Sequence, residues 1–215
     1  MTYALWWGQP TGWTAPFQPG MDTFLKGLNG SPFLQTAAQY MVGGAASSSF
    51  GGDAYDTSAP PAKVSVTTLA NEVAHELAIH AWGANVAVDP HGVYLVFTSN
   101  FPKGGGFCAW HSGATVDGVP VAVAYLPNVA GVPGCSDPAA PSTVDPGFAA
   151  QVNDTSHEFM ESITDPQINA WYDQAGREIG DKCETTYGAA VTIGGQSFNL
   201  QEEWSNSTGG CVASS

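Results

Sequence analysis

Basic residues are scarce in this chain of 215 residues, which has five Lys and Arg against 19 Asp and Glu and a formal net charge of −14. A surface of that sign repels nucleic acid and anionic membranes, so we expect neither as a partner. No apolar run is long enough to span a bilayer, and residues 1–20 lack the basic start and apolar stretch of a signal peptide. We therefore expect a mature, water-soluble form. We also expect a monomer.

Two further motifs are absent, a nucleophile elbow and a phosphate-binding loop. There is no Gly-x-Ser-x-Gly elbow, which argues against a serine hydrolase of that type. The glycines at 104–106 run into a predicted strand and not into a helix, so they do not form a phosphate-binding loop.

Cysteine is limited to four residues, and none of them forms a Cys-x-x-Cys pair, which disfavours a zinc ribbon or a thioredoxin-type site. Three connectivities are possible, and chain proximity favours Cys108–Cys135 and Cys183–Cys211. Each bridge would contribute on the order of 3 kcal/mol by the loop-entropy model. Four reduced, buried thiols are the alternative. Disulfides indicate an oxidising compartment, so we expect a secreted, extracellular protein.

Helix-type and strand-type segments alternate along a chain that is 43% hydrophobic. Strands in succession with helices between them predict parallel neighbours with right-handed crossovers, and the turn at 116–118 predicts an antiparallel hairpin at one edge. A loop with one short extended segment near Phe50 is expected over 43–61. The expected strands are 3–8, 63–66, 93–99, 107–112 and 119–126, and the expected helices are 21–42 (broken at 29–32), 68–82 and 148–163.

The predicted fold class is therefore α/β (α+β). We expect a zincin-like mixed, mostly parallel twisted sheet with an antiparallel edge hairpin and with helix 148–163 packed beneath it. Residues 1–166 would form this domain. Residues 167–215 would form a small disulfide-linked appendage, with a hairpin turning at Gly194-Gly195, packed on the same domain.

The string from His157 to Glu161 reads His-Glu-x-x-Glu, one residue type away from the His-Glu-x-x-His signature of zinc hydrolases. On a helix His157 and Glu161 lie one turn apart on the same face, where both can bind one ion. Glu158 beside them could act as general base on a metal-bound water. We expect Zn²⁺ or another divalent cation. The alternative is a solvated acidic helix face with a structural histidine.

A zinc site of this kind needs about three protein ligands. The third would come from beyond the helix, and we prefer Glu178, then Asp181, then Asp165. His111, at the end of a predicted strand near the sheet edge, could face the cleft as a catalytic group that donates to substrate or stabilises the transition state. It could also be a ligand, or a structural histidine near a disulfide.

A second string, from His75 to His80, looks similar but has the wrong spacing. It reads His-Glu-x-x-x-His, so the two imidazoles are five residues apart and diverge by about 140° on a helix. We interpret it as part of a structural helix.

Several strings stand out at 156–166, 169–172, 178–183, 92–94, 98–99 and 108–111. Together they resemble the Exordium/phosphate-induced protein family, most specifically between 156 and 183. The resemblance implies a secreted, often wall-associated protein and adds no established enzymatic activity. Its pattern includes the positions of Glu178 and Asp181, whereas plant members have Asn where this chain has Asp165, which weakens Asp165 as a ligand. The strings that carry it are Ser156–Pro166, Asn169–Tyr172, Glu178–Cys183, Gly92–Tyr94, Thr98-Ser99 and Cys108–His111.

Two functions of different classes follow. The first is a secreted metal-dependent hydrolase, most plausibly a zinc metallopeptidase, with a peptide aligned along the strand near 107–112 or 119–126. The alternative is a non-catalytic, Exordium-type extracellular module that binds a cell-wall polymer, with any metal structural. Metal-free acid–base chemistry by paired carboxylates on a glycan is a third option.

Overall fold

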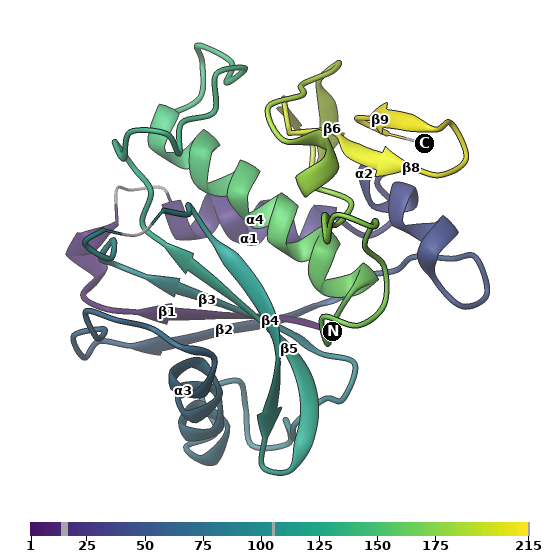
Figure 1. The fold of residues 1–215 in the computed structure, drawn as a ribbon. Helices are drawn as coiled ribbons and strands as arrows, with labels where there is room; N and C mark the ends of the chain where they lie inside the picture. Colours follow the sequence, from purple (N-terminus) through teal and green to yellow (C-terminus); the bar gives the residue numbers. More distant parts are fainter. Residues whose placement is uncertain (14–16, 105, 215) are drawn as a thin grey trace.

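A five-stranded sheet lies at the centre of the computed structural model, which describes residues 1–13, 17–104 and 106–214 (Figure 1). Its strand order is β2-β1-β3-β5-β4, with four parallel strands and with β4 antiparallel to β5 at one edge. This confirms the predicted mixed, mostly parallel class. The strands are β1 (Thr2–Trp7), β2 (Phe50–Asp56), β3 (Val93–Thr98), β4 (Trp110–Val116) and β5 (Val119–Pro127).

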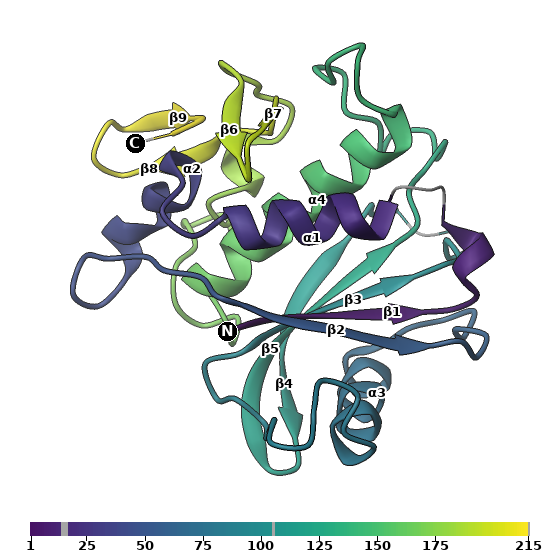
Figure 2. The ribbon, with the colours of Figure 1, turned by 180° about the vertical axis from the view of Figure 1, so that it is seen from behind.

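Helices cover both faces of the sheet. The long helix α4 and, beside it, α1 lie on one face, while α3 lies on the other (Figures 1 and 2). Short 3-10 turns complete the connections. The helical elements are η1 (Pro10–Gly12), α1 (Phe17–Gly27), α2 (Pro32–Gln35), η2 (Thr36–Tyr40), α3 (Val66–Ala78), α4 (Pro146–Thr164) and η3 (Asp181–Cys183).

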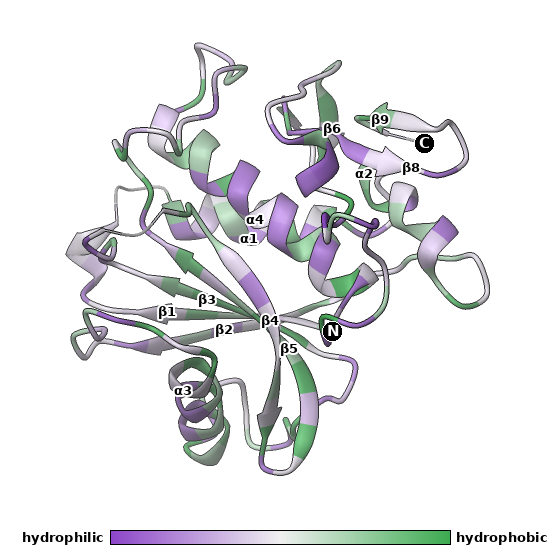
Figure 3. Ribbon diagram, viewed as in Figure 1, coloured by the Kyte–Doolittle hydropathy of each residue, from purple (hydrophilic) through white to green (hydrophobic). Residues whose placement is uncertain are grey.

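The alternation of side chains along each strand divides the core into two layers. On β1, Ala4 and Trp6 face the layer with α1 and α4, whereas Tyr3 and Leu5 face the layer with α3. Figure 3 shows the central strands as predominantly hydrophobic, and α4 as carrying hydrophilic residues along its middle turns. The polar part of α4 therefore lies inside the molecule and not on its outer surface, which is where a site can form.

The C-terminal segment from residue 167 packs on the same domain. Ile179, Val191 and Phe198 belong to the core cluster that also contains residues of α1 and α4. Two small hairpins shape the segment: β6 (Val191–Ile193) with β7 (Gln196–Phe198), and β8 (Glu203–Ser205) with β9 (Gly210–Val212). The first is the predicted hairpin; the second is an addition.

Both predicted disulfides are confirmed, Cys108–Cys135 and Cys183–Cys211. The first holds the loop before β4 to the loop before α4. The second links η3 to the terminal hairpin. In the described part of the chain, no helix combines the length and the hydrophobicity needed to cross a bilayer.

One predicted element before α3 is wrong, and another is longer than expected. Residues 63–66 do not form a strand: the Ser65 hydroxyl accepts the backbone N–H of Thr68 at 3.2 Å and caps a helix that begins at Val66. The parallel strand that precedes α3 is instead β2, which is seven residues long. It lies in the segment where we expected a loop with one short extended piece. At Gly51 in that strand an added Cβ would meet the Tyr3 ring at 2.4 Å, so glycine is needed there for packing and does not mark a loop.

Boundaries shift at two other places. Helix α3 ends at Ala78 and does not continue to residue 82 as expected, and Ile79 just beyond it is 57% exposed. The edge strand expected at 107–112 is β4, which begins at Trp110 and runs to Val116. It turns into β5 through Asp117 and Gly118, whose φ values of 48° and 81° fit a two-residue hairpin turn.

Asp53 on β2 gives the fold a pH dependence that can be measured. Its carboxylate accepts a hydrogen bond from the Trp6 indole at 2.6 Å. Burial raises its pKa to about 6, the Trp6 bond opposes the shift, and Asp22 adds to it. Because the folded state then holds more protons than the unfolded state between about pH 4 and pH 6, the free energy of unfolding falls as pH rises through that window.

Asp53→Asn keeps the acceptor and removes the charge. We expect the variant to be more stable than the wild type by on the order of 1 kcal/mol at about pH 7, with a smaller difference at about pH 4.5. Urea unfolding at both pH values measures it. An equal difference in the free energy of unfolding at both pH values would contradict the assignment of a raised pKa to Asp53.

Candidate metal centre

Helix α4 carries three of the predicted site residues. It is capped by Asp145, whose Oδ1 accepts the backbone N–H of Phe148 at 2.9 Å, and Pro146 occupies its first turn. The helix is enclosed by the sheet on one side and by the C-terminal segment on another. Glu158 and Glu161 are consequently only 6% and 3% exposed. Two carboxylates withdrawn from water in this way require compensating charge.

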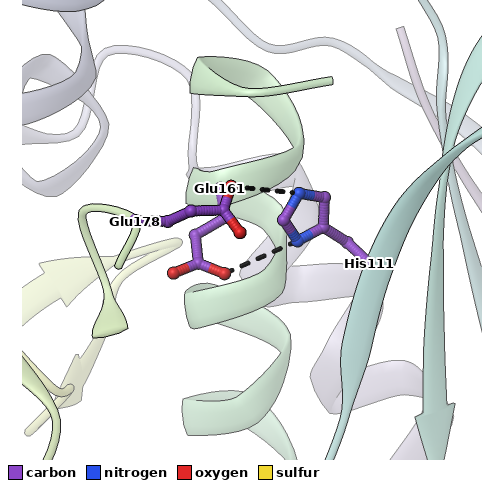
Figure 4. A group of neighbouring side chains, drawn as sticks. All are labelled: His111, Glu161 and Glu178. Atoms are coloured by element: carbon purple, nitrogen blue, oxygen red, sulfur yellow. Dashed lines mark ion pairs between the residues drawn. The ribbon is translucent and has the colours of Figure 1, made fainter. Parts of the chain in front are cut away.

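His111 on β4 provides part of that compensation (Figure 4). Its Nδ1 lies 3.4 Å from Oε2 of Glu158 and 3.5 Å from Oε2 of Glu161. Its Nε2 lies 3.4 Å from Oε1 of Glu178, which comes from the loop before η3. From its position on β4, the His111 imidazole therefore contacts residues of α4 and of the C-terminal segment.

His157 provides the second imidazole. Its Nε2 lies 3.3 Å from Oε2 of Glu161 and 3.8 Å from Oδ1 of Asp181. On the other side of the ring, Nε2 of Gln201 lies 3.0 Å from Nδ1 and donates to the Gly180 carbonyl at 2.9 Å. Nε2 of His157 is thereby turned toward the carboxylates.

The predicted residues separate into two groups that share Glu161. His157, Glu161 and Asp181 offer ligand atoms within 4.8 Å of one another, and so do His111, Glu161 and Glu178. Of the third-ligand candidates, Asp181 is thus placed with the motif histidine and Glu178 with His111.

Asp165 belongs to neither group. Its Oδ1 accepts the backbone N–H groups of Asn169 and Ala170, each at 2.6 Å, and so closes the turn that follows α4. Its backbone carbonyl lies 3.4 Å from Nε2 of His111. The contribution of Asp165 to the site is therefore to hold the exit of the helix.

The pKa values of the site residues follow from burial and mutual charge. Burial alone would lower the pKa of His111, but Glu158, Glu161 and Glu178 raise it to about 12. Burial likewise opposes the charged form of His157, and Glu161 and Glu158 outweigh it, so that its pKa is raised. Without a cation, the neighbouring carboxylates thus favour the protonated form of both imidazoles.

The pKa values of the two motif carboxylates shift in opposite directions, although burial raises both. Burial raises the pKa of Glu158, and the two histidines only partly offset this effect. Burial would also raise the pKa of Glu161, but His157 and His111 outweigh it and hold that pKa below its usual range. Glu161 is thus a permanent anion, which suits a ligand, and Glu158 is the more readily protonated group, which suits a base.

Glu203 on β8 is a buried acid next to this network. It is 0% exposed, and neither carboxylate oxygen has a hydrogen-bond partner in the described residues. Burial raises its pKa well above the usual range, His157 opposes that shift, and the site carboxylates add to it. The surroundings of Glu203 therefore favour its neutral form.

The centre opens into a cleft of about 770 Å³. Glu158, Glu161 and His157 lie along it, and Asp181, whose side chain is 45% exposed, lies at its solvent side. Strand β4 is the last strand of the sheet, and its first two residues, Trp110 and His111, line the cleft. Aromatic side chains also line the cleft: Phe101, Phe107, Trp110 and Tyr187.

The donor atoms fit a small divalent cation. Two ligands of a tetrahedral zinc ion, each about 2.0–2.1 Å from it, lie roughly 3.3 Å apart. His157 Nε2 and Glu161 Oε2 are 3.3 Å apart, and Asp181 Oδ1 is 3.8 Å from the same nitrogen. One imidazole and two carboxylates, with one side open to solvent, are a donor set that zinc accepts.

Sequence reasoning missed Gln201 and Gly180. Gln201 lies in a stretch expected to be a strand, and only the folded chain brings it to His157. An added Cβ at Gly180 would lie 2.8 Å from both Nδ1 and Cε1 of His157 and 3.0 Å from Oε1 of Glu161. The Glu-Ile-Gly-Asp string at 178–181 was used only for its acids, although its glycine is what allows the loop to approach the ring.

Gly180→Ala tests this close approach. We expect the added methyl group to displace the His157 ring and to weaken zinc binding by about 10–100-fold, the usual effect of disturbing the groups that orient a ligand. Zinc titration by calorimetry measures it. Gly210→Ala is the control, since a Cβ at Gly210 meets nothing within 4 Å. Equal affinities for the two variants would contradict the argument.

Comparison of the chain with family models, with curated proteins and with solved structures finds no match. The resemblance to the Exordium/phosphate-induced family therefore stays a prediction, and the function has to be argued from the site.

Proposed function

We propose that this protein is a metal-dependent hydrolase of the zinc metallopeptidase type, whose cation is held by His157, Glu161 and Asp181. The observation that carries the proposal is the 3.3 Å distance between His157 Nε2 and Glu161 Oε2. Asp181 Oδ1 lies 3.8 Å from the same nitrogen, and the buried carboxylate of Glu158 lies beside them. This arrangement stands next to an open cleft, where a substrate can reach it.

A divalent cation bound there supplies a Lewis acid that polarises the scissile carbonyl and acidifies water. Glu158 accepts the proton of the attacking water and then delivers it to the leaving amine as the carbon–nitrogen bond breaks. The raised pKa of Glu158, caused first by burial, favours this exchange near neutral pH. His111, held as a cation by three carboxylates, stabilises negative charge that develops on the substrate oxygen.

The edge of β4 supports a peptide as the substrate. An extended chain can pair with an unpaired strand edge through backbone hydrogen bonds, which require no particular side chain. His111 is on that strand, so a peptide paired along β4 would pass the centre. The two disulfides support an extracellular location for this activity.

The alternative proposal is a non-catalytic extracellular protein that binds a cell-wall polymer. The aromatic side chains Phe101, Phe107, Trp110 and Tyr187 along the cleft favour it, since sugar rings stack on such groups. On this alternative any cation would be structural, and the resemblance to the Exordium family would extend to function.

Removal and restoration of the ion separate the two proposals. The protein is dialysed against a chelator, assayed on a mixed peptide library, and assayed again after addition of zinc. We expect cleavage only after zinc is restored. No cleavage by a protein that has bound zinc, together with retention on wall polysaccharide, would favour the alternative.

A matched pair of variants identifies the third ligand. We expect Asp181→Asn to lower zinc affinity by more than about tenfold, while Glu178→Gln leaves it within about twofold. Calorimetric titration measures both. The reverse result would move the ion to the group of His111, Glu161 and Glu178.

A further inference from the structure

A second group of converging carboxylates lies on the other face of the sheet. Asp56 ends β2, and Glu72 and Glu76 lie one turn apart on α3. Each offers a carboxylate oxygen, and the three oxygens lie within 4.8 Å of one another. Because α3 covers the face opposite to α4 (Figure 1), this group is separate from the centre around His157.

Two of these acids carry buried oxygens that lack a partner. Glu76 is 1% exposed, and its Oε2 has no hydrogen-bond partner among the described residues; the same is true of the buried Oε1 of Glu72. Among the residues that the structure describes, no Lys or Arg side chain forms an ion pair with any of the three acids. Burial, followed by the neighbouring Asp56 and Glu76, raises the pKa of Glu72 to about 8. A proton shared between these carboxylates or a bound cation can therefore supply the charge that the buried oxygens need.

Asp56 is held in place from the loop that follows it. Its Oδ1 accepts the backbone N–H of Ser58 at 2.7 Å, and its Oδ2 accepts the Ser58 hydroxyl at 2.5 Å. Each carboxylate oxygen retains a second lone pair for another partner. The orientation of the Asp56 carboxylate is thus fixed by the loop that follows β2.

We propose that Asp56, Glu72 and Glu76 bind a calcium ion that links the end of β2 to α3. The donors are all oxygen, which selects a hard cation such as Ca²⁺ over zinc. Three carboxylates can supply up to about six of the six to eight oxygens that Ca²⁺ takes, and water supplies the remainder. The site is independent of the proposed hydrolase activity.

Thermal unfolding after chelation, with and without added Ca²⁺, tests the site. We expect Ca²⁺ to raise the melting temperature of the wild type by about 5 °C. Glu72→Gln/Glu76→Gln, which relieves repulsion and so remains folded, is expected to show no rise. Glu161→Gln, which alters only the other centre, is expected to keep its Ca²⁺ response. No rise in the wild type, or an equal rise in the double variant, would overturn the proposal.

Trp7 allows the ion to be located independently. Its indole N–H donates to Ser58 Oγ at 3.0 Å, and that hydroxyl in turn contacts Asp56, so the ring lies beside the group. We expect Tb³⁺ bound at the site to emit when tryptophan is excited, and Ca²⁺ to displace it. Trp7→Phe should lose most of this emission yet keep the Ca²⁺-dependent rise in melting temperature. Undiminished emission from Trp7→Phe would place the ion elsewhere.

Discussion

Glu158→Gln is expected to lower the rate of peptide hydrolysis by about 10²–10⁴-fold, the range found when a general base is removed. The amide has the same shape as the carboxylate but cannot take a proton from water. Because Glu158 lies beside the three proposed ligands and is not one of them, the variant should bind zinc as the wild type does. Turnover on a cleaved peptide, measured together with zinc content per chain, checks both statements.

The control for Glu158→Gln is Glu202→Gln, which removes a carboxylate outside the cleft. It should leave turnover and zinc content unchanged. A Glu158→Gln protein that binds zinc and cleaves peptide at the wild-type rate would exclude Glu158 as the base. A protein that loses zinc would instead make Glu158 a ligand.

Glu161→Gln is expected to have the larger effect on the protein as a whole. Glu161 is 3% exposed, and its Oε2 contacts both imidazoles, His111 at 3.5 Å and His157 at 3.3 Å. Removing its charge takes the common partner away from both histidines. We expect loss of zinc binding, loss of activity, and a fall in the free energy of unfolding on the order of 3 kcal/mol, as when one member of a buried ion pair is removed.

Denaturant unfolding of the chelated proteins isolates the stability part of this prediction. Glu184→Gln is the matched control, because Glu184 lines the same cleft but is exposed. It should change the free energy of unfolding by less than about 0.5 kcal/mol. If Glu161→Gln and its control unfold alike, the carboxylate is not the common partner that the structure indicates.

Local patterns predicted the elements in which one signal dominates. The apolar run at 93–98 gave β3, and the Asp117-Gly118 turn gave the hairpin of β4 and β5. Strand β2 was expected only as a short extended segment near Phe50, because Gly51 and Gly52 look like loop residues, and the packing of Tyr3 against Gly51 explains the first of them. The strand expected at 63–66 shows the converse, since apolar alternation there gave way to the Ser65 cap of α3.

The candidate site also has parts that local sequence patterns predict and parts that they do not. Helical spacing alone placed His157, Glu158 and Glu161 on one helix, and the structure brings them together. Spacing could not choose between Glu178 and Asp181, because that choice depends on how the loop after α4 folds back. Nor could spacing pair Asp56 with α3. The string from His75 to His80 drew attention to its histidines, whereas the residue that joins Asp56 is the buried acid between them, Glu76.

An anomalous difference map from zinc-loaded crystals, recorded on both sides of the zinc absorption edge, tests the central claim most directly. The account predicts a peak about 2.0–2.2 Å from Nε2 of His157 and from one oxygen each of Glu161 and Asp181. A map with no peak there at saturating zinc, and with His157 and Glu161 still in direct contact, would contradict it.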